Sequence, residues 1–129
     1  MNNNTEKIKN FTDLNTWKEA HKLTLIIYKI TEKFPKEELY SLTNQMRRAS
    51  ISITSNIAEG FSRISYKEKI YFYSIAQGST TELQNQIILS RDLNYIPIND
   101  FDNLFNQSII VHKLLNGLIR GAKNFKENS

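Results

Sequence analysis

The sequence predicts an all-α protein that folds as an up-down-up-down left-handed four-helix bundle. Apolar residues recur at spacings of three and four in four segments, which is typical of helices that bury one face. Three breaks that contain proline, glycine or asparagine separate these segments. The connections are short, which favours antiparallel neighbours, and a chain of 129 residues is usually one domain.

The first segment carries a helical stripe that ends just before Pro35. Its members are Trp17, Ala20, Thr24, Ile27, Tyr28, Thr31 and Phe34. Pro35 fits a break, because proline has no backbone N–H and its ring clashes inside a helix. Glu37 and Glu38 then fit the first turn of a second helix, where the helix dipole favours carboxylates.

The second segment shows a conflict between two periodicities. Its helical stripe comprises Leu39, Leu42, Met46, Ala49, Ile53 and Ile57. The run 49–57 also alternates with period two and is rich in β-branched residues, which favours a strand. A strand would need a pairing partner that no other segment offers. We therefore predict a helix that packing stabilises, with Gly60 at its C-cap.

The third and fourth segments have the same helical spacing. The third stripe comprises Phe72, Ala76, Ser79, Leu83, Ile87 and Ser90. A glycine inside this helix, Gly78, suggests a close approach of a neighbouring helix. After the break at 94–97, Asn99 is the predicted N-cap of the last helix. The fourth stripe comprises Phe101, Leu104, Phe105, Ser108, His112, Leu115 and Ile119.

Apolar residues beside the last two stripes make these sectors wider than one bundle face needs. They are Ile70, Tyr71, Tyr73, Ile75, Ile88, Ile109, Ile110, Val111, Leu114 and Leu118. Sectors this broad would leave apolar patches exposed on a monomer, and such patches usually mark association surfaces. We therefore predict self-association, with scattered surface apolar residues as the alternative.

Composition excludes several classes of protein. The chain has no cysteine, which removes disulfides, thiolate metal sites and thiol catalysis. Its longest apolar run is about four residues, far short of the ~20 of a membrane span, and residues 1–10 do not resemble a secretory signal. We predict one cytoplasmic domain over 1–129 with no membrane partner, a flexible arm at 1–12 and a frayed end at 124–129.

The sequence lacks the residue sets of the metal and ribonuclease sites found in helical bundles. A carboxylate-bridged metal pair needs Glu-x-x-His on two helices, and neither His21 nor His112 has a Glu three residues before it. Neither histidine follows an Arg at the spacing of a bundle ribonuclease, and no glycine-rich phosphate loop is present. We predict no catalytic residue, no metal and no cofactor.

Polar residues on otherwise apolar faces predict a structural network between the second and third helices. Its members are Gln45, Asn56, Glu59 and Glu82. Because a buried carboxylate is costly unless it is paired, we expect one of the two glutamates to meet Arg47 or Arg48 across the helix pair. A catalytic site is the alternative, but no nucleophile, base and orienting group occur together.

Basic residues form a candidate surface for nucleic acid, on a chain with a formal net charge of +4. Four lysines spaced by four, seven and four share one face of the first helix, namely Lys18, Lys22, Lys29 and Lys33. Further candidates are Arg47, Arg48, Arg63, Lys67, Lys113 and Arg120. Contacts of this kind bind phosphates without reading sequence and weaken with salt. The alternative is a solvated outer face, since Glu19 and Glu32 lie among the lysines.

Several motifs resemble a known bacterial family. They are Phe11-x-Asp13-Leu14, Trp17-Lys18-x-Ala20, Phe34-Pro35 ahead of Tyr40-Ser41-Leu42-Thr43, the run 45–61, Gly78-Ser79-x-x-Glu82-Leu83 and Leu114-Leu115-x-Gly117-Leu118-Ile119. They are similar to four-helix bundle proteins encoded in intervening sequences of 23S ribosomal RNA genes. The resemblance implies a homopentamer without assigned enzymatic activity. It also implies a relationship to accessory proteins of diversity-generating retroelements, which are thought to bind nucleic acid and a reverse transcriptase.

The residues and the resemblance together predict a non-enzymatic, oligomeric bundle that binds RNA or DNA through its basic surface. The alternative is a protein-interaction scaffold with no role in nucleic-acid binding.

Overall fold

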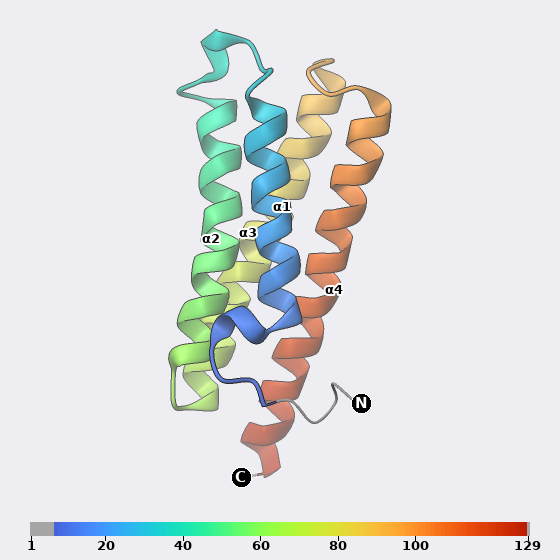
Figure 1. Cartoon of the computed structure of the whole chain (residues 1–129). Coiled ribbons are helices and arrows are strands. Elements are labelled where there is room, and N and C mark those ends of the chain that lie inside the picture. The colour runs from blue at the N-terminus through green and yellow to red at the C-terminus, as the bar shows by residue number, and fades with distance from the viewer. Residues whose placement is uncertain (1–6, 129) are drawn as a thin grey trace.

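The computed structural model describes residues 7–128 and is helical, without a strand in that range (Figure 1). The elements in chain order are η2 (Phe11–Asp13), α1 (Asn15–Thr31), η3 (Lys36–Glu38), α2 (Leu42–Ser62), α3 (Tyr66–Asp92) and α4 (Ile98–Asn128), where η denotes a 3-10 helix. The predicted all-α class is therefore confirmed. The run 49–57 is helical in spite of its strand-like pattern.

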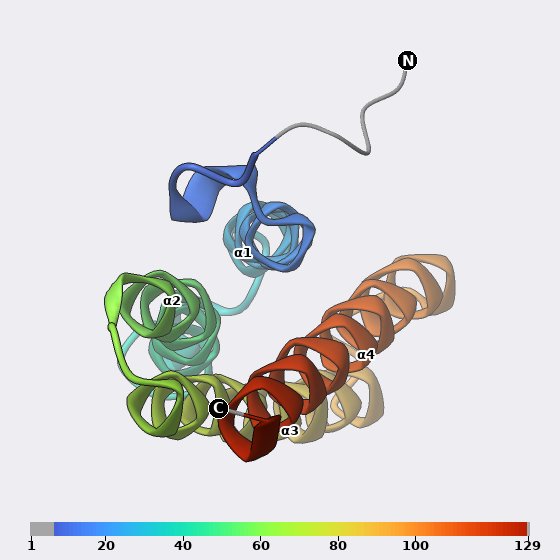
Figure 2. The same cartoon turned by 90° about the horizontal axis from the view of Figure 1, so that it is seen from below.

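The four α-helices form an antiparallel bundle. Seen along its axis, they follow one another around the bundle in the order α1, α2, α3 and α4, with α4 inclined to its neighbours (Figure 2). Each helix packs against the helices before and after it, and α4 closes the ring against α1. This is the predicted up-down-up-down topology. No helix within 7–128 has both the length and the apolar character needed to cross a membrane.

The core lies along the predicted stripes, apart from the fully buried Leu23, which was in no stripe, and Val111, which was predicted beside the fourth stripe. Its fully buried large apolar side chains come from all four helices and are Leu23, Ile27, Met46, Ile53, Ile57, Leu83, Ile87, Leu104, Val111 and Leu115. Two stripe members are on the surface, since Tyr28 is 38% and Leu39 46% exposed. In the second stripe, the β-branched Ile53 and Ile57 are fully buried. Removal of their side chains from water stabilises this helix in spite of their low helix propensity.

The glycines differ from their predicted roles. Gly60 is not a C-cap, because α2 continues to Ser62 and Gly60 is buried within it. A Cβ atom at Gly60 would lie 2.6 Å from Cε1 of Tyr73 in α3, so this glycine permits the close approach of the two helices. The close approach predicted at Gly78 is wrong, because a Cβ atom there would have no neighbouring atom within 4 Å.

The starts of α4 and of η2, the short helix before α1, differ from each other in their capping. The predicted N-cap at Asn99 is wrong, because α4 already begins at Ile98 and the carbonyl of Pro97 accepts from the amide of Phe101 at 2.9 Å. Before α1, the Asn10 side chain accepts from the amide of Thr12 at 2.9 Å, and the Asp13 carboxylate accepts from the amide of Asn10 at 3.1 Å.

The two ends of the chain are described only in part. Residues 1–6 of the predicted arm lie outside the described residues. Within the rest of it, the Phe11 ring packs edge-on against Trp17, with ring centroids 5.4 Å apart. At the other end α4 reaches Asn128, and the fraying predicted for 124–129 stays a prediction.

Candidate nucleic-acid interface

Three of the four predicted lysines lie together on the outer face of α1, and the fourth lies just beyond its end. We call this set the lysine row, and it comprises Lys18, Lys22, Lys29 and Lys33, all of which are exposed. The first three lie within a sector of roughly 40° on an ideal helix, opposite the buried Leu23 and Ile27. Lys33 lies two residues beyond the last residue of the helix. Within 7–128, none of the four forms an ion pair.

One of the two acidic residues among the lysines, Glu19, is engaged with α4. The Glu19 side chain is directed to α4, where its carboxylate accepts a hydrogen bond from Nε2 of Gln107 at 2.9 Å. The same amide nitrogen donates to the Glu19 backbone carbonyl at 2.9 Å, and Gln107 itself is buried. Glu19 therefore joins α1 to α4.

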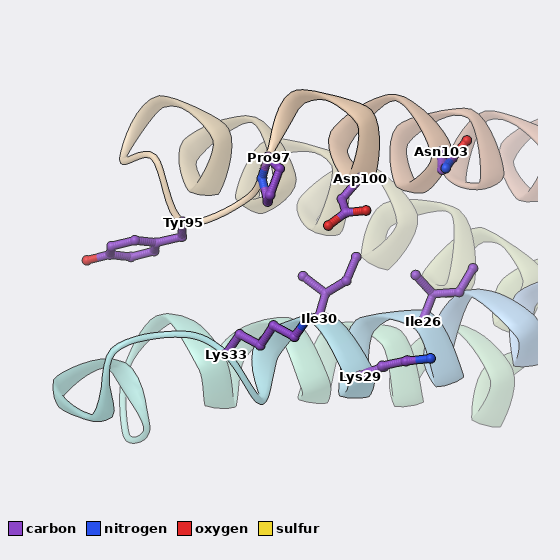
Figure 3. A pocket seen from close by; sticks show the side chains of 8 residues that line it. All are labelled: Ile26, Lys29, Ile30, Lys33, Tyr95, Pro97, Asp100 and Asn103. Atoms are coloured by element: carbon purple, nitrogen blue, oxygen red, sulfur yellow. The ribbon is translucent and has the colours of Figure 1, made fainter.

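A pocket next to the row, here called the α1–α4 slot, has a volume of about 340 Å³ (Figure 3). It is lined by Ile26, Lys29, Ile30, Lys33, Tyr95, Pro97, Asp100 and Asn103. Figure 3 shows the two isoleucines pointing from α1 toward α4 and Asp100 pointing back from α4. The lysine row thus ends at a recess that has apolar walls and one carboxylate.

The wall formed by Tyr95 is fixed in place. Its hydroxyl donates to the Glu38 carboxylate at 2.9 Å, and its ring lies 5.2 Å from that of Phe34. The hydrogen bond to Glu38 raises the pKa of the Tyr95 hydroxyl. Hydrogen bonds from Ser41 and Tyr95 in turn lower the pKa of the Glu38 carboxyl. These contacts join the two loops at the same end of the bundle.

Arg47 is held on the opposite flank of α1. Its guanidinium lies 4.7 Å from the centre of the Tyr28 ring, and its Nε donates to the hydroxyl of Thr31 at 3.0 Å. The side chain is half-buried. Arg47 therefore contributes to the packing of α1 on α2 and does not extend the lysine row.

Two of the four predicted polar residues of α2 and α3, Gln45 and Glu82, line a surface hollow of about 300 Å³. Its other lining residues are Arg48, Ala49, Ser52 and Ser79. The hydroxyls of Ser52 and Ser79 are 2.8 Å apart and link the two helices. Asn56 supports this link, because its amide donates to the carbonyl of Ser52 at 2.8 Å. A polar connection between α2 and α3 exists, and its centre is a pair of serines.

The predicted ion pair across these helices is wrong. Glu59 pairs at 2.7 Å with Arg63, which follows the end of the same helix. The carboxylate of Glu82 accepts a hydrogen bond from the side-chain Nε2 of Gln86 at 3.3 Å. Gln45, Glu59 and Glu82 are exposed. Because water solvates these carboxylates, they need no arginine across the interface.

The remaining predicted cations lie at two other places. Arg63 bridges Glu59 and Glu68 near the connection between α2 and α3, and its guanidinium lies 4.7 Å from the centre of the Phe72 ring. Lys67 is exposed beside it. Lys113 and Arg120 are exposed on α4. The ten predicted residues therefore occupy several faces, and only the lysine row adjoins the α1–α4 slot.

The histidines are not brought together with metal-ligating groups. Within 7–128 no three His, Cys, Asp or Glu residues are placed to share a metal ion. The exposed His21 ring stacks on Trp17, with ring centroids 4.7 Å apart. His112 is half-buried, and its Nδ1 has no hydrogen-bond partner.

The slot residues from α4 and its preceding loop were not identified from the sequence. The slot residues from the first helical segment could be grouped from the sequence, because they share one face of the predicted helix at spacings of three and four. They are Ile26, Lys29, Ile30 and Lys33. Pro97 and Asp100 carry no such local signal, since they join the site only through the packing of α4 against α1.

Fold and surface define a small antiparallel four-helix bundle with a row of exposed lysines along its first helix and just beyond it. The chain belongs to the family described as 23S rRNA-intervening sequence protein, whose model matches residues 12–117. A solved structure of a protein with unknown function from the S23 ribosomal protein family of Bacteroides thetaiotaomicron has the same fold, with a TM-score of 0.75. It is 22% identical, and the match covers 81% of this chain and 95% of that one. The comparison with curated proteins found no match.

Proposed function

We propose that this protein is a non-enzymatic, oligomeric four-helix bundle of the cytoplasm that binds RNA or DNA through the lysine row. The observation that carries the proposal is the set of four exposed lysines without ion pairs in the described chain. Cations arranged in this way exchange small counterions for phosphates, and the released counterions drive binding.

Two features support a role in binding over catalysis. Among the described residues no three metal-ligating groups are placed to share an ion, and the hydroxyls of Ser52 and Ser79 hydrogen-bond to each other and not to Glu82, which lines the same hollow. The surface feature that favours binding is the positive charge of the lysine row. Phosphate contacts need charge and position only, which a rigid helix supplies.

Exposed apolar side chains support self-association, for which we propose a homopentamer. Leu25 of α1 is 59% exposed, Ile51 of α2 42% and Tyr71 of α3 62%. Leu25 and Ile51 directly follow Thr24 and Ser50, whose hydrogen bond of 3.2 Å joins α1 to α2. Apolar surface at such a place favours a contact with a second copy, which would also bring several lysine rows into one assembly.

Charge reversal of the lysine row tests the proposal. The variant carries Lys→Glu at Lys18, Lys22, Lys29 and Lys33, and fluorescence anisotropy measures its affinity for labelled RNA and DNA at low salt. We expect a loss of at least about tenfold, because four phosphate contacts become repulsive.

A matched control separates the row from net charge. Lys→Glu at the exposed Lys7, Lys9, Lys36 and Lys123 changes the net charge equally on other surfaces. We expect this control to retain most of the affinity. Equal losses of affinity in the two variants would show that net charge, and not the position of the lysines in the row, determines binding. Absence of binding by the unaltered protein would exclude the nucleic-acid role and leave the scaffold, whose protein partner would be recovered after nuclease treatment.

A further inference from the structure

We propose that the α1–α4 slot takes one unstacked base of a single-stranded nucleic acid, with a preference for bases that present an amino group. This inference rests on the proposed nucleic-acid binding and adds the class of nucleic acid and a contact that reads the base. It is argued from the walls of the slot, its carboxylate and the lysines beside it.

The walls fit the faces of a base. Ile26 and Ile30 of α1 face α4 across the slot, and Pro97 lies on the other side (Figure 3). Tyr95 lies at one end of the slot with its side chain directed away from it, and its hydrogen bond to Glu38 holds this end in place before a ligand enters (Figure 3). Apolar side chains on two sides favour burial of the face of a ring, and preformed walls reduce the entropy lost on binding.

The size and position of the slot favour a single strand over a duplex. A volume of about 340 Å³ lies near the lower end of small-molecule pockets and suits one planar ring system. In a duplex the faces of the bases are covered by their neighbours, whereas the bases of single strands can be splayed out and stacked on protein. A duplex could therefore reach the lysine row and would leave the slot empty.

The charges agree with this placement. Lys29 and Lys33 line the slot and lie four residues apart in the chain, so phosphates on either side of an inserted base would meet cations. Asp100 points into the slot, where it would repel a phosphate or an acidic peptide. A carboxylate accepts hydrogen bonds from amino groups, such as N4 of cytosine. Asp100 has no ion pair within 7–128, which leaves its oxygens available.

The carboxylate predicts which bases are favoured. Cytosine presents an amino group to Asp100, whereas uracil presents one N–H between two carbonyl oxygens that repel the carboxylate. The two bases have similar size and shape, so the apolar walls do not distinguish them. The structure therefore predicts that short oligo(C) binds more tightly than oligo(U) of the same length.

The experiment measures the affinities of labelled oligo(C), oligo(U) and a hairpin duplex for the full chain by fluorescence anisotropy at low salt. We expect oligo(C) to bind about tenfold more tightly than oligo(U), the size expected for one good base contact. The substitution Asp100→Ala should bring this ratio close to one. The control Asp102→Ala removes the same charge from the exposed Asp102, which does not line the slot, and should keep the ratio.

The outcomes separate this inference from the function on which it rests. Equal affinities for oligo(C) and oligo(U), or a ratio that Asp100→Ala leaves unchanged, would overturn base insertion. Tighter binding of the duplex than of the single strands would do the same. In each of these cases the lysine row would still bind nucleic acid. If none of the three probes binds at low salt, both proposals fail.

Discussion

Replacement of Gly60 by alanine tests the closest contact between α2 and α3. A Cβ atom at this position would lie 2.6 Å from Cε1 and 2.8 Å from Cδ1 of Tyr73. The Tyr73 ring is only 3% exposed, so it has little room to move. Overpacking of a core costs about 1–3 kcal/mol, and contact with two atoms of a buried ring places this case near the upper limit. Alanine regains about 1 kcal/mol of helix propensity. The net expectation is a loss of about 2 kcal/mol.

Gly78→Ala is the matched control, because Gly78 is also inside a helix but a Cβ atom there meets no atom within 4 Å. It should stabilise the protein by up to about 1 kcal/mol. Urea unfolding at one fixed protein concentration measures both variants, with unchanged slopes expected. Thermal midpoints should differ by roughly 10 °C between the two variants. If Gly60→Ala proves as stable as Gly78→Ala, the helices do not approach each other as closely as described.

Two further predictions concern acid stability and assembly. The pKa of Glu38 is lower in the folded chain than its usual 4.5, because Ser41 and Tyr95 donate hydrogen bonds to the carboxylate. The stability that the Glu38 carboxylate contributes is therefore present above pH 4.5 and is lost as the pH falls through the folded pKa. The thermal midpoint of the unaltered protein should fall between about pH 5 and about pH 3, and that of the Glu38→Gln variant should fall less. Native mass spectrometry should find an oligomer that Leu25→Glu with Ile51→Glu dissociates, and a monomeric unaltered protein would contradict the proposed assembly.

Helical periodicity predicted the fold because it reports burial directly. Ile53 and Ile57 lie four residues apart, and both are fully buried even though their neighbourhood resembles a strand. The roles of the glycines could not be predicted in this way. Gly60 and Gly78 both lie inside helices, and what distinguishes them is the ring of Tyr73, which comes from another helix.

The candidate site was predictable only where one helix supplies it. The lysine row follows from spacing along α1, and the structure leaves all four side chains exposed. The predicted partners of Glu59 and Glu82 were wrong because spacing does not show that both carboxylates are solvated. Asp100 could not be assigned to the slot, since only the packing of α4 against α1 brings it near Lys29.

The salt dependence of single-stranded RNA binding tests the central claim, that the lysine row binds phosphates. Four contacts to a single strand predict that the logarithm of the association constant falls with the logarithm of the salt concentration with a slope of about −2.8. The affinity should therefore fall about 50-fold between about 50 mM and about 200 mM salt. The slope should flatten when the four lysines of the row are reversed. Absence of binding at the lower salt concentration, or a slope near zero, would contradict the claim.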